Sequence, residues 1–250
     1  DDFIKKFPQN SMSNLVHYQA GVIYHQKKKY DIATNFLLKA TASPDPDVRA
    51  KSFALLGEIE LNSKNYQQAY KYYNAARDLN PKNSDIINRS IFGIAISNFY
   101  SGNIKESFDF LKTLEETSPG FENAKVNYFI AECYFAEGKY SDALSYYNRV
   151  STDDDEINNL TMYGKGYSYF NSKDYVNASF QFADYLKKYG KDSKAADVRI
   201  RLADSYFADK KYSMAITIYE QLLSSKQQIK NADYVQYQYV LALFRNNQKE

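Results

Sequence analysis

Residues Met162 to Tyr185, MYGKGYSYFNSKDYVNASFQFADY, contain the pattern that decides the fold. Two short helices, 162–172 and 175–188, are predicted on either side of a polar Asn-Ser-Lys-Asp corner, which makes an antiparallel hairpin. Small residues at Gly166 and Ala178 would let the two helices approach closely. The space around that contact would be filled by large rings: Tyr169, Tyr175 and Phe182.

The same unit recurs six times at intervals of 35 to 38 residues. Its second helix begins at an opening residue: Tyr30, Tyr66, Ile104, Tyr140, Tyr175 or Tyr212. A small residue follows three positions later: Ala33, Ala69, Ser107, Ala143, Ala178 or Ala215. A bulky plug residue follows four positions after that: Leu37, Tyr73, Leu111, Tyr147, Phe182 or Tyr219. Nine positions before the opening residue stands Gly21, Gly57, Ala95, Ala131, Gly166 or Ala203. Four positions in register over six units indicate a repeat array without a single central core.

The repeat register predicts an all-α chain made of antiparallel helix pairs. Each pair would consist of a first helix and a second helix joined by a short corner. The predicted pairs are 12–26 with 30–42, 47–62 with 66–79, 84–101 with 104–116, 122–137 with 140–150, 156–172 with 175–188, and 194–209 with 212–224. Pro44, Pro46, Pro81 and Pro119 mark stops between pairs, and nearby Asn, Ser and Asp residues can cap the helix that follows.

This pattern resembles the tetratricopeptide repeat, a unit of about 34 residues with Leu-Gly, Ala-x-x-x-Phe and Pro signatures. The second unit carries the matching residues: Leu56, Gly57, Ala69, Tyr73, Ala76 and Pro81. The chain departs from the family pattern in having no Trp, Ile104 at one opening position, and one to four extra residues per unit. The resemblance implies a right-handed superhelical solenoid of about six repeats, whose first helices line a concave face.

The two ends of the chain resemble parts of a repeat. Residues 1–7, DDFIKKF, align with Ala183 to Tyr189, ADYLKKY, inside a second helix. Residues 229–250 include a stretch from Asp233 that is predicted to be a first helix without its partner. We therefore expect residues 1–250 to form one solenoid that is a fragment of a longer array. Such half-repeats would also allow two copies to associate end to end.

Composition and motif searches favour a binding role over catalysis. The formal net charge is +2, with no basic stripe, which disfavours nucleic acid as a partner. No apolar run reaches the 18 or so residues of a membrane span. Cys133 is the single cysteine, and His17 and His25 have no matching ligands on their helix. No catalytic, cofactor or metal site is therefore expected, and the chain is predicted not to be an enzyme.

Large apolar groups on the predicted concave face indicate a surface for a protein or peptide partner. The candidate binding residues are Tyr18, Phe92, Phe99, Tyr100, Tyr128, Glu132, Phe135, Tyr163, Tyr167, Phe170 and Phe207. Family members that capture acidic chaperone tails use Lys, Arg and Asn at the equivalent places, so that ligand is disfavoured. An apolar segment, with a basic residue facing Glu58, Glu132 and Asp204, fits better. The alternative is that some of these rings bury against the adjacent repeat.

A finer resemblance concerns the cellular setting. Residues Phe3 to Ser11, echoed at Tyr185 to Ser193, are similar to the repeat junction of bacterial cell-envelope tetratricopeptide proteins. Those proteins include lipoproteins and periplasmic scaffolds of the barrel-assembly and Tol-Pal kind. The resemblance implies an assembly scaffold in the periplasm or at the outer membrane, with a cytoplasmic location as the alternative. A second reading is a sensory or regulatory array joined to a kinase or DNA-binding domain outside residues 1–250.

Overall fold

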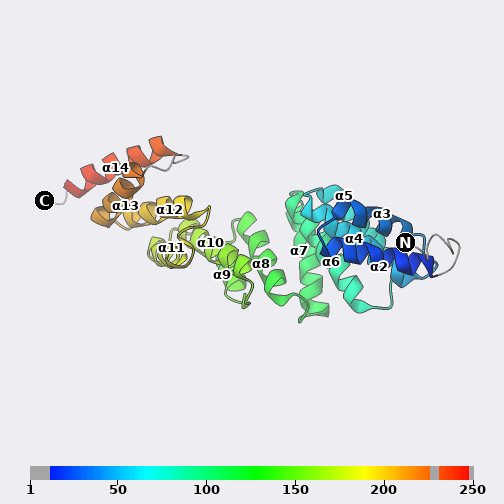
Figure 1. The fold of residues 1–250 in the computed structure, drawn as a ribbon. Helices are drawn as coiled ribbons and strands as arrows, with labels where there is room; N and C mark the ends of the chain where they lie inside the picture. The colour runs from blue at the N-terminus through cyan, green and yellow to red at the C-terminus, as the bar shows by residue number, and fades with distance from the viewer. Residues whose placement is uncertain (1–11, 226–230, 248–250) are drawn as a thin grey trace. The chain divides into compact units, whose positions relative to one another are not determined.

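The computed structural model describes residues 12–225 and 231–247, and within these ranges every regular element is a helix (Figure 1). The half-repeat predicted at residues 1–7 lies outside them. The first helices are α2 (Ser13–Gln26), α4 (Pro46–Asn62), α6 (Ser84–Tyr100), α8 (Asn123–Ala136), α10 (Asp155–Asn171), α12 (Ala195–Ala208) and α14 (Ala232–Asn247). The second helices are α3 (Tyr30–Ala40), α5 (Tyr66–Asp78), α7 (Ile104–Thr117), α9 (Tyr140–Tyr147), α11 (Tyr175–Tyr189) and α13 (Tyr212–Ser224).

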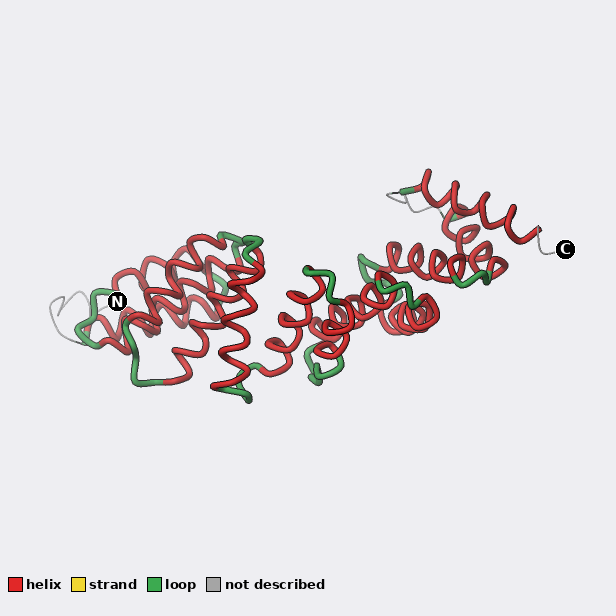
Figure 2. Tube along the Cα trace, turned by 180° about the vertical axis from the view of Figure 1, so that it is seen from behind, coloured by secondary structure: helices red, strands yellow, loops and turns green. Residues whose placement is uncertain are grey.

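The predicted helix pairs are confirmed, and all six second helices begin at their opening residue. The main difference is α9, which was predicted to reach residue 150 and ends at Tyr147. Beyond Tyr147 the backbone tightens, because the amides of Arg149 and Val150 donate to carbonyls three residues earlier. Short loops join the helices, as the green segments of Figure 2 show.

The chain divides into two compact units, residues 1–129 and 130–250, with the division inside α8. In unit 1, consecutive helices pack as hairpins from α2 to α7. In unit 2 the same holds from α9 to α14. First helices also contact the first helix of the next repeat, as α4 does with α6 and α12 with α14. A single solenoid over residues 1–250 remains a prediction.

Side-chain size sets the helix spacing as the sequence predicts. A Cβ added at Gly166 would lie 2.4 Å from the ring of Phe182, and one at Gly21 would lie 2.6 Å from Leu37. Some plug residues also reach the first helix of the next repeat. A Cβ at Gly93 would lie 2.3 Å from the ring of Tyr73. Only glycine leaves room for that ring at close-packed density.

Polar side chains hold the helix ends. Asp45, Asn83 and Asp154 cap α4, α6 and α10 by accepting from the backbone N–H two residues later, at 2.9, 2.9 and 3.0 Å. Asp154 also accepts from the backbone N–H of Ile157, at 3.2 Å. Each corner has a residue with positive φ two positions before the opening residue: Lys28, Lys64, Gly102, Gly138, Lys173 and Lys210.

Candidate protein-binding surface

In unit 1 the candidate residues gather around a ring that the sequence analysis did not select. Phe129 is 8% exposed, and its centroid lies 5.5 Å from Phe99, 6.1 Å from Phe92 and 6.2 Å from Tyr100. Tyr128 lies 5.0 Å from Phe129 and is itself buried. We call Phe92, Phe99, Tyr100, Tyr128 and Phe129 the α6–α8 aromatic cluster.

The members of this cluster differ in their access to solvent. Tyr100 is 50% exposed and stacks on Tyr66 with centroids 5.1 Å apart. Phe92 and Phe99 are half-buried, so their edges remain accessible. Tyr128 and Phe129 form the floor. The cluster therefore presents partly exposed rings above two buried ones. Aromatic side chains such as Tyr are enriched among the anchor residues of interfaces.

Other predicted binding rings pack inside their own repeat. Phe135, Phe170 and Phe207 each stand five residues before an opening tyrosine. The centroids of these pairs lie 5.4 to 5.5 Å apart. His25 makes the same contact with Tyr30 at 5.5 Å. Tyr18 is half-buried against the core around Leu37 and Leu56. All these side chains remain partly exposed. Packing between the two helices of a pair, however, already requires large side chains at most of these positions.

Two acids of the predicted concave face, Glu132 and Asp204, accept hydrogen bonds from plug tyrosines. The Tyr147 hydroxyl donates to Oε1 of Glu132 at 2.5 Å. Asp204, which is 7% exposed, accepts from Tyr219 at 2.6 Å and from Tyr234 at 3.0 Å. Burial raises the pKa of the Asp204 carboxyl, and these donors with Arg201 oppose that shift. These hydrogen bonds give both acids a structural role on this face.

Unit 2 carries a polar network on α10 and α12. Tyr163 donates to Oδ2 of Asp197 at 2.9 Å, and Tyr167 donates to the same oxygen. Nε of Arg201 donates to the Tyr167 hydroxyl at 3.3 Å, and Nη1 donates to Oδ2 of Asp204 at 2.9 Å. Burial, followed by hydrogen bonding within this network, raises the pKa of Tyr163 and Tyr167, so both stay protonated donors at neutral pH.

The Arg201 side chain is held in place from several directions. Its guanidinium carbon lies 5.9 Å from the Tyr167 centroid and 5.7 Å from the Phe170 centroid. The side chain keeps 29% of its surface exposed. An arginine that is fixed by rings and a buried carboxylate loses little entropy when it binds. Arg201 is therefore a functional candidate that the sequence analysis missed, since the rings of Tyr167 and Phe170 that fix it belong to another helix, α10.

The helix that carries His25 offers it no matching metal ligand, but the fold brings one carboxylate near it from another helix. Nε2 of His25 lies 3.5 Å from Oε1 of Glu58 on the next first helix. In the described part of the chain, no group of three or more His, Cys, Asp or Glu residues could hold a metal ion. None of the helices in the described ranges combines the length and apolar composition needed to cross a membrane.

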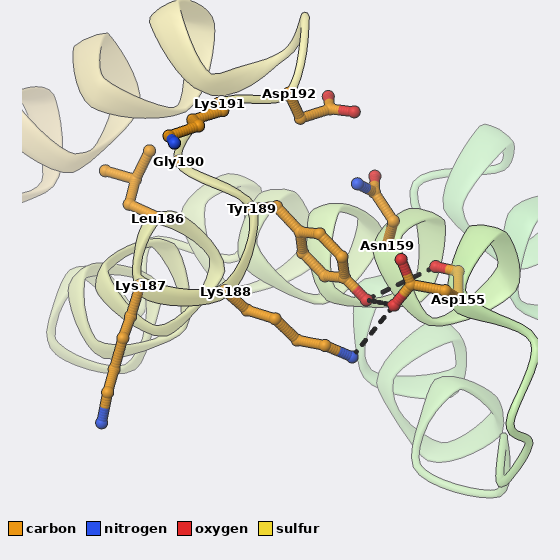
Figure 3. Close-up of a pocket in the computed structure, with 9 residues that line it drawn as sticks. All are labelled: Asp155, Asn159, Leu186, Lys187, Lys188, Tyr189, Gly190, Lys191 and Asp192. Atoms are coloured by element: carbon orange, nitrogen blue, oxygen red, sulfur yellow. Dashed lines mark hydrogen bonds and ion pairs between the residues drawn. The ribbon is translucent and has the colours of Figure 1, made fainter.

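A cavity of about 520 Å³ lies between the start of α10 and the end of α11 (Figure 3). Asp155 accepts from the Tyr189 hydroxyl at 2.7 Å and lies 3.3 Å from Nζ of Lys188. On the other side, Asp192 accepts from Tyr185 at 3.1 Å and from the backbone amide of Lys194 at 2.8 Å. The two carboxylates of this cavity, Asp155 and Asp192, therefore already have donors within the protein, which favours a structural junction.

Family models match both parts of the chain. The tetratricopeptide repeat model matches residues 16–43 and 50–83. The model of the YfiO outer membrane lipoprotein family matches residues 153–250. Comparison with curated proteins gives no match.

Solved structures share the fold at low sequence identity. A tetratricopeptide repeat protein from Parabacteroides merdae is 17% identical with a TM-score of 0.65, over 94% of this chain and 89% of that one. PilF from Pseudomonas aeruginosa is 16% identical with a TM-score of 0.67, over 90% of this chain and 97% of that one. YrrB, a protein with an unusual peptide-binding site, is 17% identical with a TM-score of 0.60, over 84% of this chain and 97% of that one.

These comparisons agree with the repeat pattern, in which the plug residues Leu37, Tyr73 and Phe182 pack on Gly21, Gly57 and Gly166 of their first helices. Such domains bind protein or peptide partners. The chain has the fold of tetratricopeptide repeat proteins, and its residues 16–43 and 50–83 match the repeat model of that family.

Proposed function

We propose that this protein is a non-enzymatic scaffold that binds a protein or peptide segment on the face formed by its first helices. The α6–α8 aromatic cluster is the main anchor in unit 1. Its partly exposed rings, led by Tyr100 at 50% exposure, carry the proposal. Tyr and Phe give large contact areas at low entropic cost, and a preformed cluster loses little freedom on binding. The peptide-binding site of the similar structure YrrB supports this mode.

In unit 2 the proposed contact surface is formed by Tyr163, Tyr167, Phe170 and Arg201. Because Glu132 and Asp204 accept hydrogen bonds from buried tyrosines, a basic residue of the partner gains little from them. We infer that apolar and aromatic side chains of the partner dominate recognition. The outer membrane lipoprotein match over residues 153–250 supports a role in a bacterial envelope assembly.

The experiment is a pull-down from separated cytosolic and envelope fractions of the source organism. It compares the native chain with a Phe92→Ser, Tyr100→Ser variant whose helical content is checked by circular dichroism. The matched control is Tyr70→Ser, which removes a ring of 40% exposure from the second helix α5. We expect an envelope protein that the control retains and the double variant loses. Equal retention by both variants would refute the aromatic anchor, and capture only from cytosol would refute the envelope location.

A further inference from the structure

One second helix differs from the other five on its exposed side. In α11 the first and fifth positions after the opening residue are Val176 and Phe180. At the same two positions the other second helices have Asp31 and Asn35, Gln67 and Lys71, Lys105 and Asp109, Ser141 and Ser145, and Ser213 and Thr217. The hairpin register therefore does not require apolar side chains at these positions, and α11 has acquired them for another reason.

The side chains of Val176 and Phe180 both face solvent. Val176 is 42% exposed and Phe180 is 64% exposed, whereas the plug residue Phe182 on the same helix is fully buried. Positions i and i+4 lie on the same side of a helix, one turn apart. They therefore form one apolar patch, and it lies on a second helix, away from the first-helix face of the proposed function. An exposed apolar patch within an otherwise polar row indicates a contact surface.

The charges beside this patch suit a second copy of the same helix. Lys173 and Asp184 are both exposed, and neither is ion-paired in the described part of its own chain. Two copies can pack their α11 helices antiparallel, with the crossing point level with residues 178 and 179 along the helix axis. Lys173 of each copy then comes opposite Asp184 of the other. The same crossing places Phe180 against Val176 of the second copy. A two-fold contact requires this reciprocity, in which the same pair forms twice.

We propose that two copies of this protein associate through α11, with Val176 and Phe180 at the centre and Lys173–Asp184 ion pairs on both sides. A single helix pair covers much less than the roughly 800 Å² per partner of a stable interface. The association is therefore weak and reversible by itself. It becomes effective where the chain is concentrated, and it leaves the first-helix face free for its partner.

Sedimentation velocity of the 250-residue chain over a concentration series tests this contact. We expect the weight-average sedimentation coefficient of the native chain to rise with concentration. Phe180→Asp should abolish that rise, because it buries an unpaired carboxylate at the centre of the contact. The matched control is Met214→Asp, at a 47% exposed residue of α13, and it should behave as the native chain does.

A charge exchange makes the test specific to the two-fold geometry. Lys173→Asp and Asp184→Lys should each abolish self-association, because each places like charges opposite one another. The double variant restores opposite charges and should recover association. The left-handed backbone of Lys173, with φ of 64°, tolerates Asp, so the corner keeps its fold. A native chain that stays monomeric, association that survives Phe180→Asp, or a double variant that fails to recover would overturn the proposal.

Discussion

The Tyr219 hydroxyl donates a 2.6 Å hydrogen bond to Oδ1 of Asp204, which stands fifteen residues earlier in the chain. Tyr147 and Glu132 have the same spacing and make the same contact at 2.5 Å. Both tyrosines are plug residues, buried between helices. A buried phenol needs an acceptor for its proton, and an acid on the first helix of the same pair supplies it.

The remaining repeats follow the same rule. Tyr73 is the third plug tyrosine, and Glu58 stands fifteen residues before it; burial, then the charge of Glu58, raises the pKa of the Tyr73 phenol. Where the plug residue is Leu37, Leu111 or Phe182, the residue fifteen positions earlier is Val22, Ile96 or Tyr167. An acid appears at this position only when the plug has a hydroxyl to satisfy.

The first prediction concerns the pair Glu132 and Tyr147. Glu132→Leu alone should destabilise the fold by about 1–3 kcal/mol, because it leaves the buried hydroxyl without its acceptor. Adding Tyr147→Phe removes that hydroxyl and should recover part of the loss. Urea denaturation of the four proteins in this double-mutant cycle measures the coupling. Strictly additive changes in the free energy of unfolding would show that the hydrogen bond between Glu132 and Tyr147 does not stabilise the fold.

The second prediction concerns the pH dependence of stability through Asp204. Burial raises the pKa of this carboxyl, so the folded state retains a proton that the unfolded chain has already released. The contribution of Asp204 to the free energy of unfolding therefore falls as pH rises above the ordinary carboxyl pKa of about 4. The stability of the native chain relative to Asp204→Asn should decline over that window.

Urea denaturation of both proteins at a series of pH values measures this difference. Carboxyls with lowered pKa, such as Asp155, which accepts from Tyr189, give the opposite slope. They are present in both proteins, so their contribution cancels in the comparison. A relative stability that rises with pH would mean that Arg201 and the tyrosine donors outweigh burial.

The third prediction concerns Gly93 and the plug residue Tyr73. A Cβ at Gly93 would lie 2.3 Å from the Tyr73 ring, so Gly93→Ala should destabilise unit 1 by about 1–3 kcal/mol through overpacking. Tyr73→Leu introduces the residue type found at the plug positions of two other repeats. The double variant should therefore be more stable than Gly93→Ala alone.

Thermal unfolding followed by circular dichroism compares these variants. Gly120→Ala is the control, since a Cβ there meets no atom within 4 Å. Its melting temperature should match that of the native chain. If adding Tyr73→Leu lowers the melting temperature of Gly93→Ala further, a clash with the Tyr73 ring is not the reason that glycine is needed at position 93.

The fourth prediction concerns the corners between the two helices of a pair. Lys64 has φ of 62°, a left-handed backbone that costs a non-glycine residue about 1–2 kcal/mol. Lys64→Gly should stabilise the fold by about 0.5–1 kcal/mol, after allowance for the greater entropy of glycine in the unfolded chain. The reverse change, Gly102→Ala at φ of 85°, should destabilise it. Urea denaturation measures the change in the free energy of unfolding for both variants. Changes in the same direction would contradict this explanation.

The sequence allowed close prediction of the helices, because helix boundaries depend on local signals. Opening tyrosines, prolines and capping Asn or Asp residues act over a few positions, and every helix start in the six pairs lies within one residue of the predicted one. The contact between Gly166 and Phe182 was also predictable, since the repeat brings those positions together in each hairpin. The acid–tyrosine spacing was present in the sequence as well, but its meaning required knowing which side chains meet.

The sequence by itself determined the fold family, the repeat register and the set of large side chains on the first helices. Only the tertiary structure decided which of them remain accessible. It places Phe129 beneath Phe99 and Tyr100, and it fixes Arg201 between side chains of α10 and α12. Helical periodicity specifies the face of a helix on which a residue lies. Exposure and hydrogen bonding depend on the neighbouring helix, whose distance and rotation are set by packing along the whole repeat.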